Sequence, residues 1–202
     1  MTAMSAADAR AMLVDQNLIA VGARGDEDRR RRHGKKTTFV RVFEVRTDAV
    51  PPALPASARA GEIRVTGKPA SVAEAIATVK AARALAGSTP VSAFSLADLL
   101  ELAGGTAASL TDLVARLAAA GLGIVAEAPI DLLPDAVVAV GAARAAGVQV
   151  PRLTVHHVPV DERIRLVTLA RDIQSAVGGV RAFAPLARVN SVAQPSTGYD
   201  DV

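Results

Sequence analysis

The chain has 202 residues, enough for one well-buried domain, and half of them are apolar, mostly Ala, Val and Leu. It contains no cysteine, which excludes disulfides, cysteine-bound zinc, cysteine-bound iron–sulfur clusters and a thiol nucleophile. A formal charge of +3 is a mild basic excess, and the scarcity of aromatic side chains argues against base stacking on single-stranded nucleic acid.

Neither a leader nor a membrane span is expected. The first ten residues, MTAMSAADAR, lack the apolar core of a signal peptide. The longest uncharged apolar run, 117–126, is far shorter than the ~20 residues of a membrane-spanning helix. We therefore expect a cytoplasmic protein with no membrane partner.

The N-terminal part, residues 1–36, is predicted to be a helical segment. Apolar spacing predicts one helix over 6–20, and Gly22 and Gly25 then separate it from a short helix over 26–33 that Gly34 ends. Acids begin this short helix and the run RRRRHGKK follows, which allows two interpretations. One is nucleic-acid binding through phosphate neutralisation. The other, which we favour because no aromatic residues are interleaved, is a solvated helix covering the foot of a barrel.

A strand is predicted over 37–45, with Phe39 and Phe43 on one face. A long loop over 46–61 follows it. Pro51, Pro52 and Pro55 exclude a helix of useful length in this loop. An α/β enzyme normally places catalytic groups after such a strand, yet this loop holds no histidine, no cysteine and no glycine-rich phosphate cradle.

From residue 62 onward, predicted strands alternate with predicted helices. The strands are predicted at 62–67, 90–94, 122–127, 151–157 and 180–186, and the helices at 71–86, 95–103, 109–120, 134–146 and 161–176. Such alternation is typical of βα units and a parallel sheet. A full eightfold barrel takes ~250 residues. The fold class expected is therefore α/β, as a partial six-unit TIM-like barrel over 37–190, followed by a tail over 191–202.

Six segments in collinear order resemble one enzyme family. They are RRRRHGKKTTFV, EIRVTGKP, SAFSLAD, LTDLVARLAAAGLGIVAEAPIDLL, DERIRLVTLARDIQSAVGGVRAFAPLA and STGYDD. Together they are similar to the radical S-adenosylmethionine enzymes of the futalosine route to menaquinone, namely aminofutalosine synthase and cyclic dehypoxanthine futalosine synthase. The resemblance spans roughly residues 10–202 and implies a barrel of the radical S-adenosylmethionine type.

The departures from this family bear on function. The family holds its iron–sulfur cluster with three cysteines in the loop after the first strand, where this chain has residues 46–61 and no cysteine. The family's Gly-Gly-x-His-Pro is replaced by residues 66–69, which lack the histidine, and residues 123–127 keep only Glu127 of a Gly-rich strand end. We therefore expect no iron–sulfur cofactor and no radical chemistry, and nothing in the sequence supports S-adenosylmethionine binding.

Candidate site residues lie where the predicted strands end, because barrels of this kind bind ligands there. The residues at these ends are Glu44, Arg46, Lys68, Ser92, Ser95, Glu127, His156, His157 and Arg188. Arg46, Lys68 and Arg188 could form a rim for a carboxylate or phosphate, or could be solvated charges at loop starts. Glu127 is the expected ligand-binding acid, with a plain salt bridge as the alternative.

His156 and His157 invite a metal or general-base interpretation. Adjacent strand residues point to opposite faces, so both cannot easily bind one ion from the strand. A structural histidine is preferred, and no metal is expected.

Two functions remain open. The first is a non-catalytic, cluster-free relative that acts as partner or regulator of a full-length radical enzyme, or that self-associates. The second is a protein that kept the substrate pocket and binds, or acts without radicals on, a nucleoside or aromatic carboxylate.

Overall fold

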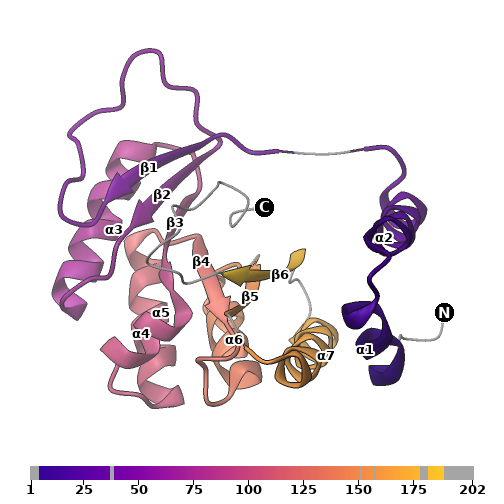
Figure 1. Cartoon of the computed structure of the whole chain (residues 1–202). Coiled ribbons are helices and arrows are strands. Elements are labelled where there is room, and N and C mark those ends of the chain that lie inside the picture. Colours follow the sequence, from indigo (N-terminus) through magenta and orange to yellow (C-terminus); the bar gives the residue numbers. More distant parts are fainter. Residues whose placement is uncertain (1–4, 37–38, 151, 157, 178–181, 189–202) are drawn as a thin grey trace, which may run out of the picture.

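The computed structural model describes residues 5–36, 39–150, 152–156, 158–177 and 182–188 (Figure 1). His157 and the predicted tail over 191–202 therefore lie outside the described residues. The helices are α1 (Ala6–Val14), α2 (Leu18–His33), α3 (Val72–Ala86), α4 (Leu96–Leu102), α5 (Ala107–Ala120), α6 (Ala136–Ala145) and α7 (Val160–Val177). The strands are β1 (Val42–Arg46), β2 (Glu62–Thr66), β3 (Val91–Ser95), β4 (Ile124–Pro129), β5 (Arg152–His156) and β6 (Ala182–Arg188).

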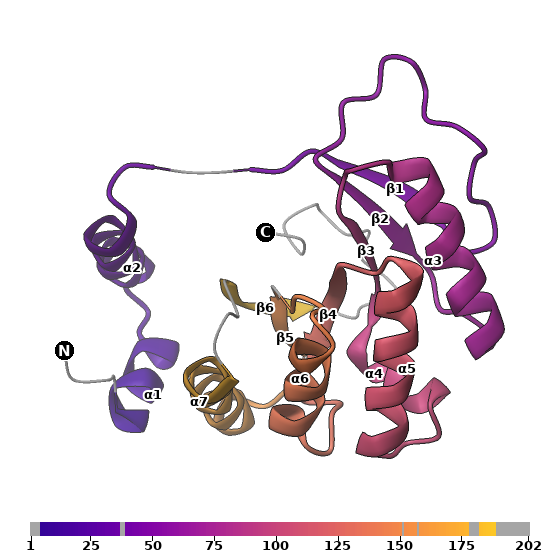
Figure 2. The ribbon, with the colours of Figure 1, turned by 180° about the vertical axis from the view of Figure 1, so that it is seen from behind.

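The strands form one parallel six-stranded sheet, so the predicted α/β class with a parallel sheet is confirmed. Their order across the sheet is the order along the chain, which makes β1 and β6 its two edges among the described residues. Right-handed connections between sequence-ordered parallel strands place the connecting helices on one face. Neighbouring contacts from α3 to α5, α5 to α6 and α6 to α7 agree with a single helical layer (Figure 2).

The core lies between this layer and the sheet. Val45, Val65, Ala93 and Val125 are register partners across four strands, and none is more than 4% exposed. The next row, shifted by one residue, contains Glu44, Arg64, Ser92 and Ile124. Alternation along a strand puts this second row on the opposite face. Glu44 is exposed, Arg64 and Ile124 are half-buried and Ser92 is buried, so this face is the more accessible of the two.

Capping residues fix most helix starts. Ser71 accepts a hydrogen bond from the backbone N–H of Glu74, and the carboxylate of Glu74 accepts one from the N–H of Ala70. Thr106 caps α5, so this helix begins at residue 107 instead of 109, and Asp112 lies beyond its first turn. Its end at Gly121 is confirmed, with the left-handed backbone that glycine adopts most readily.

The N-terminal helices differ from the prediction. The expected break at Gly22 and Gly25 is wrong, because α2 runs through both glycines. The chain instead breaks before Leu18, where Asp15 accepts from the N–H of Asn17 and Asn17 caps the new helix. Ion pairs one turn apart then stabilise the C-terminal half of α2, joining Asp26 and Asp28 to arginines 29–31.

The position of α2 also differs from expectation. It was predicted to cover the foot of a barrel, but both views show it standing apart from the sheet and its helical layer (Figures 1 and 2). Leu18 and Ile19 are 77% and 87% exposed. α1, in contrast, packs on α7 of the body. The solvated character of α2 was predicted correctly, because its sequence has no continuous apolar face.

The loop between β1 and β2 contains no helix, which confirms the prediction from its prolines. The loop leaves the sheet after β1 and returns to the start of β2 (Figure 1). The two strands pair in parallel, beginning with Val42 opposite Glu62. Among the described helices, none is both long enough and apolar enough to cross a membrane.

Candidate functional site

Glu127 is a buried carboxylate near the carboxyl end of β4. It is 8% exposed and accepts a hydrogen bond from Thr154 Oγ1 of β5 at 3.3 Å. Its register partner on β3 is Ser95. A buried charge must be hydrogen-bonded to be tolerated. The structure therefore brings together two predicted site residues, Glu127 and Ser95, and adds Thr154, which sequence analysis missed.

The backbone beside this carboxylate is unusual. Phe94 has φ 58°, the only positive φ of a non-glycine residue among those described. Such a conformation costs about 1–2 kcal/mol, and the 97% burial of Phe94 offsets it. The turn lets β3 pass straight into α4, with Ser95 as the helix cap. Backbone strain of this kind is often found at ligand sites, although here packing of Phe94 also accounts for it.

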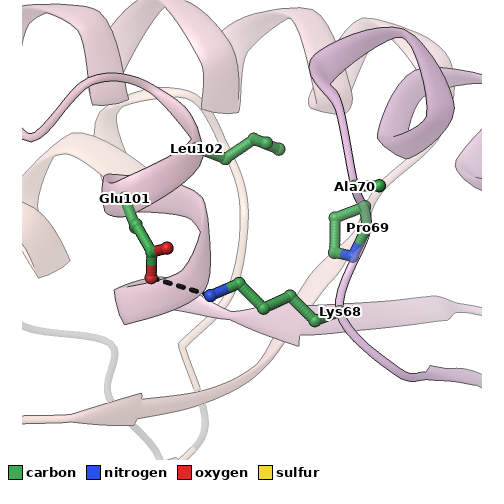
Figure 3. Close-up of a pocket in the computed structure, with 5 residues that line it drawn as sticks. All are labelled: Lys68, Pro69, Ala70, Glu101 and Leu102. Atoms are coloured by element: carbon green, nitrogen blue, oxygen red, sulfur yellow. Dashed lines mark hydrogen bonds and ion pairs between the residues drawn. The ribbon is translucent and has the colours of Figure 1, made fainter.

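Lys68 lies in an open depression of about 460 Å³ (Figure 3). The residues that line it are Lys68, Pro69, Ala70, Glu101 and Leu102. Lys68 Nζ is 2.7 Å from Glu101 Oε2 and 3.6 Å from Asp98 Oδ1. The hydrogen bond to Glu101, aided by the charges of Glu101 and Asp98, raises the pKa of Lys68. Lys68 is thus charged but already paired with acids of α4.

Gly67 shapes the turn that presents Lys68. Its φ is +102°, and a Cβ there would lie 2.6 Å from Thr47 Oγ1. A glycine satisfies both constraints because it has no Cβ. Residues 66–69 therefore form a turn that depends on a glycine at position 67.

The predicted cationic rim is spread over the sheet. Arg46, at the end of β1, makes two hydrogen bonds to Asp48 at 2.8 and 2.7 Å, and these bonds raise the pKa of Arg46. Arg188 lies on β6, where it is the register partner of His156 on β5. Since β1 and β6 are opposite edges of the sheet, Arg46 and Arg188 are not on neighbouring strands.

A charged network on the accessible face of the sheet was not predicted. Glu62 Oε1 accepts from Ser92 Oγ at 2.6 Å and from Arg64 Nε and Nη2 at 3.1 and 2.9 Å. The side chains of Arg64 and Glu62 are only 23% and 12% exposed. The opposite charges in the segment EIRVT were the only sequence signal for this network. They did not indicate that Ser92 is the partner of Glu62, or that Glu62 and Arg64 are largely buried.

These groups suit binding better than chemistry. Within the described parts of the chain, no three histidine, aspartate or glutamate side chains are placed to hold a metal ion. Ser92 Oγ donates to the Glu62 carboxylate, which Arg64 also contacts, and Ser95 Oγ accepts from the N–H of Ala97 at the start of α4. Polar groups converge at Glu127 and at Glu62, and both places could orient a bound molecule.

Comparison with known proteins finds no match: no protein-family model fits the chain, and no curated protein is detectably similar to it.

Proposed function

We propose that this chain is a non-catalytic, cluster-free relative of the menaquinone-pathway radical S-adenosylmethionine enzymes, built as a partial barrel, and that it binds a full-length radical enzyme. The observation that carries the proposal is the arrangement around β1. Six parallel strands follow one another in sequence order, as in consecutive barrel units, yet a cysteine-free loop follows the first strand.

The accessible face of the sheet is the proposed contact surface. Parallel sheets are normally covered on both faces. Here Glu44 is exposed and Arg64 and Ile124 are half-buried, while Ser92 in the same row is buried, and the connecting helices of the described chain lie on the other face. A partner that supplies the missing barrel units would cover this row and the open edge at β1.

The experiment is a pull-down with the tagged chain as bait and a purified full-length aminofutalosine synthase or cyclic dehypoxanthine futalosine synthase from the same organism as prey. Glu44→Lys should weaken capture by reversing a charge on the accessible face. Asp112→Lys also reverses an acidic charge, but on the exposed side of α5, and should leave capture unchanged. Failure to capture either enzyme, at concentrations where a weak complex would be retained, would refute the proposal.

A second candidate function is small-molecule binding at Glu127. The buried carboxylate, its bond to Thr154 and the strained turn at Phe94 favour it. S-adenosylmethionine, futalosine-like nucleosides or aromatic carboxylates should then raise the melting temperature of the chain by preferential binding to the folded state.

Glu127→Gln keeps the size of the side chain and removes its charge, so it should abolish such a shift. Asp112→Asn, an equivalent change at an exposed position of α5, should preserve it. The absence of any shift across the three ligand classes would remove the support for this candidate.

A further inference from the structure

We propose that two copies of this chain exchange their N-terminal arms, so that α1 of one copy packs on α7 of the other. The arm is defined as residues 5–41, comprising α1, α2 and the linker 34–41. This inference is independent of the proposed function, because it concerns only how the arm is held.

The first argument is the path of the arm. It joins the body at β1, one edge of the sheet, but docks on α7, which packs against β5 and β6 at the other edge. In both views α2 stands apart from the sheet and from β1 (Figures 1 and 2). The linker's described residues, 34–36 and 39–41, are all exposed. Arg41 is nevertheless held to the body by its backbone, because its carbonyl accepts hydrogen bonds from the N–H groups of Gly61 and Glu62. A linker held to the body at one end can deliver α1 to a neighbouring copy.

The second argument is how weakly the arm is held within one chain. Of the described α1 side chains, only those of Ala9 and Met12 are half-buried, and the others are exposed. The ion pair between Arg10 and Asp161 joins side chains that are 58% and 70% exposed. Exposed ion pairs contribute little, and a nine-residue helix is marginal in water without tertiary support.

The third argument is the apolar surface that the arm leaves uncovered. Five of the eight large apolar side chains that are exposed in the described chain lie between residues 14 and 40. Phe39 is 86% exposed and Val40 is 52% exposed, and both lie in the linker.

Exchange keeps the contact between α1 and α7 and adds a new one. In a two-fold dimer with exchanged arms, the two linkers run past each other near the symmetry axis. Phe39 and Val40 of both copies then cover one another. This added contact favours exchange over docking within one chain, where the short tether otherwise gives α1 a high effective concentration at its own α7.

The chain has no cysteine, so two introduced thiols can be cross-linked without competition. Arg10→Cys with Asp161→Cys places one thiol on α1 and one on α7, within reach of a short bis-maleimide. Lys68→Cys with Glu101→Cys is the control, because its two residues form an ion pair inside the body at 2.7 Å. The products are separated by denaturing electrophoresis, and the mass of the uncross-linked chain is measured by light scattering.

Arm exchange predicts a cross-linked dimer for the first pair, an intrachain product for the control, and a mass of twice 20.7 kDa. An intrachain product for the first pair overturns the proposal, whether the chain is a monomer or dimerises through another surface. No product from the first pair, when the control reacts, also overturns it, because α1 would not be docked on any α7.

A second measurement tests the linker contact. Phe39→Ser should shift the dimer toward monomer by at least about tenfold in dissociation constant, as expected for loss of a buried aromatic anchor. Leu132→Ser changes a 58% exposed apolar residue of the body and should leave the dissociation constant unchanged. Equal effects of the two substitutions would contradict the exchanged arrangement.

Discussion

The body of the molecule, from β1 to α7, and its N-terminal arm form helices for different reasons. In the body, side chains of the helical layer such as Leu110, Val114 and Leu117 are fully buried against the sheet. In the arm, Leu18 and Ile19 are mostly exposed, and the helices depend on caps and on ion pairs one turn apart. Burial stabilises the first region, whereas local interactions and the contact between α1 and α7 hold the second. The same substitution should therefore have different effects in the two regions.

The largest difference is expected for truncation of leucine. Leu117→Ala removes a fully buried side chain of α5 and should lower the free energy of unfolding by about 2–5 kcal/mol. Leu18→Ala, at a 77% exposed position of α2, should change it by less than about 0.5 kcal/mol. Chemical denaturation of both variants measures the difference. Similar losses would mean that the arm is part of the cooperative core.

Replacing a glycine by alanine should destabilise the body but should favour the helix in the arm. Gly121 has φ +111°, and a Cβ there would lie 2.5 Å from Arg83 Cγ, so Gly121→Ala should destabilise the body by about 1–3 kcal/mol. Gly22 lies inside α2 with nothing within 4 Å of an added Cβ. Gly22→Ala should raise helicity, because alanine favours a helix by about 1 kcal/mol over glycine. Denaturation and circular dichroism, respectively, measure these outcomes. A loss of helicity in Gly22→Ala would show that the arm requires this glycine.

Removal of a helix cap should have a smaller effect. Ser71→Ala removes the acceptor for the N–H of Glu74 at the start of α3 and should cost about 1 kcal/mol in unfolding free energy. Ser5→Ala removes the equivalent bond to Asp8 in α1. Because α1 has little burial, this change should fray the helix without moving the global transition. Hydrogen exchange of the first turn and the denaturation midpoint together separate the two cases.

Acidification should have the smallest effect, and a local one. Hydrogen bonds from the side chain and backbone of Ser5 hold the pKa of Asp8 below its usual value. A carboxyl whose pKa is lower in the folded state stabilises that state above its unfolded pKa and loses this contribution as pH falls through the folded value. The α1 cap should therefore weaken below about pH 4. A carbon NMR titration of Asp8 checks this, and Ser5→Ala should return its pKa toward the usual range.

Much of the fold could be predicted because the body repeats strong local signals. Helices predicted over 71–86 and 109–120 are found as α3 and α5 with the same last residues, and the prolines excluded a helix between β1 and β2. The arm was predicted less well, because the break at residues 15–17 depends on two side-chain-to-backbone hydrogen bonds. A helix can also tolerate glycines such as Gly22 and Gly25, so they were a poor guide to that break.

The candidate site was only partly predictable. Glu127 and Ser95 were identified as strand-end residues, and the structure makes them register partners. Thr154 and the bond from Ser92 to Glu62 were not foreseen, because both depend on which strands are neighbours and on their register. The same reason separates Arg46 from Arg188, which the sequence grouped as one rim.

The sequence by itself determined the absence of cysteine-based chemistry, the positions of most helices and strands, and the parallel α/β class. Composition, caps and periodicity act within a few residues of each other and can be recognised without coordinates. Only the tertiary structure decided which polar groups are buried together, that Lys68 is paired with α4, and that α2 stands apart from the sheet while α1 packs on α7. Those properties depend on strand register and on which surfaces exclude water, and residues distant in the chain establish both.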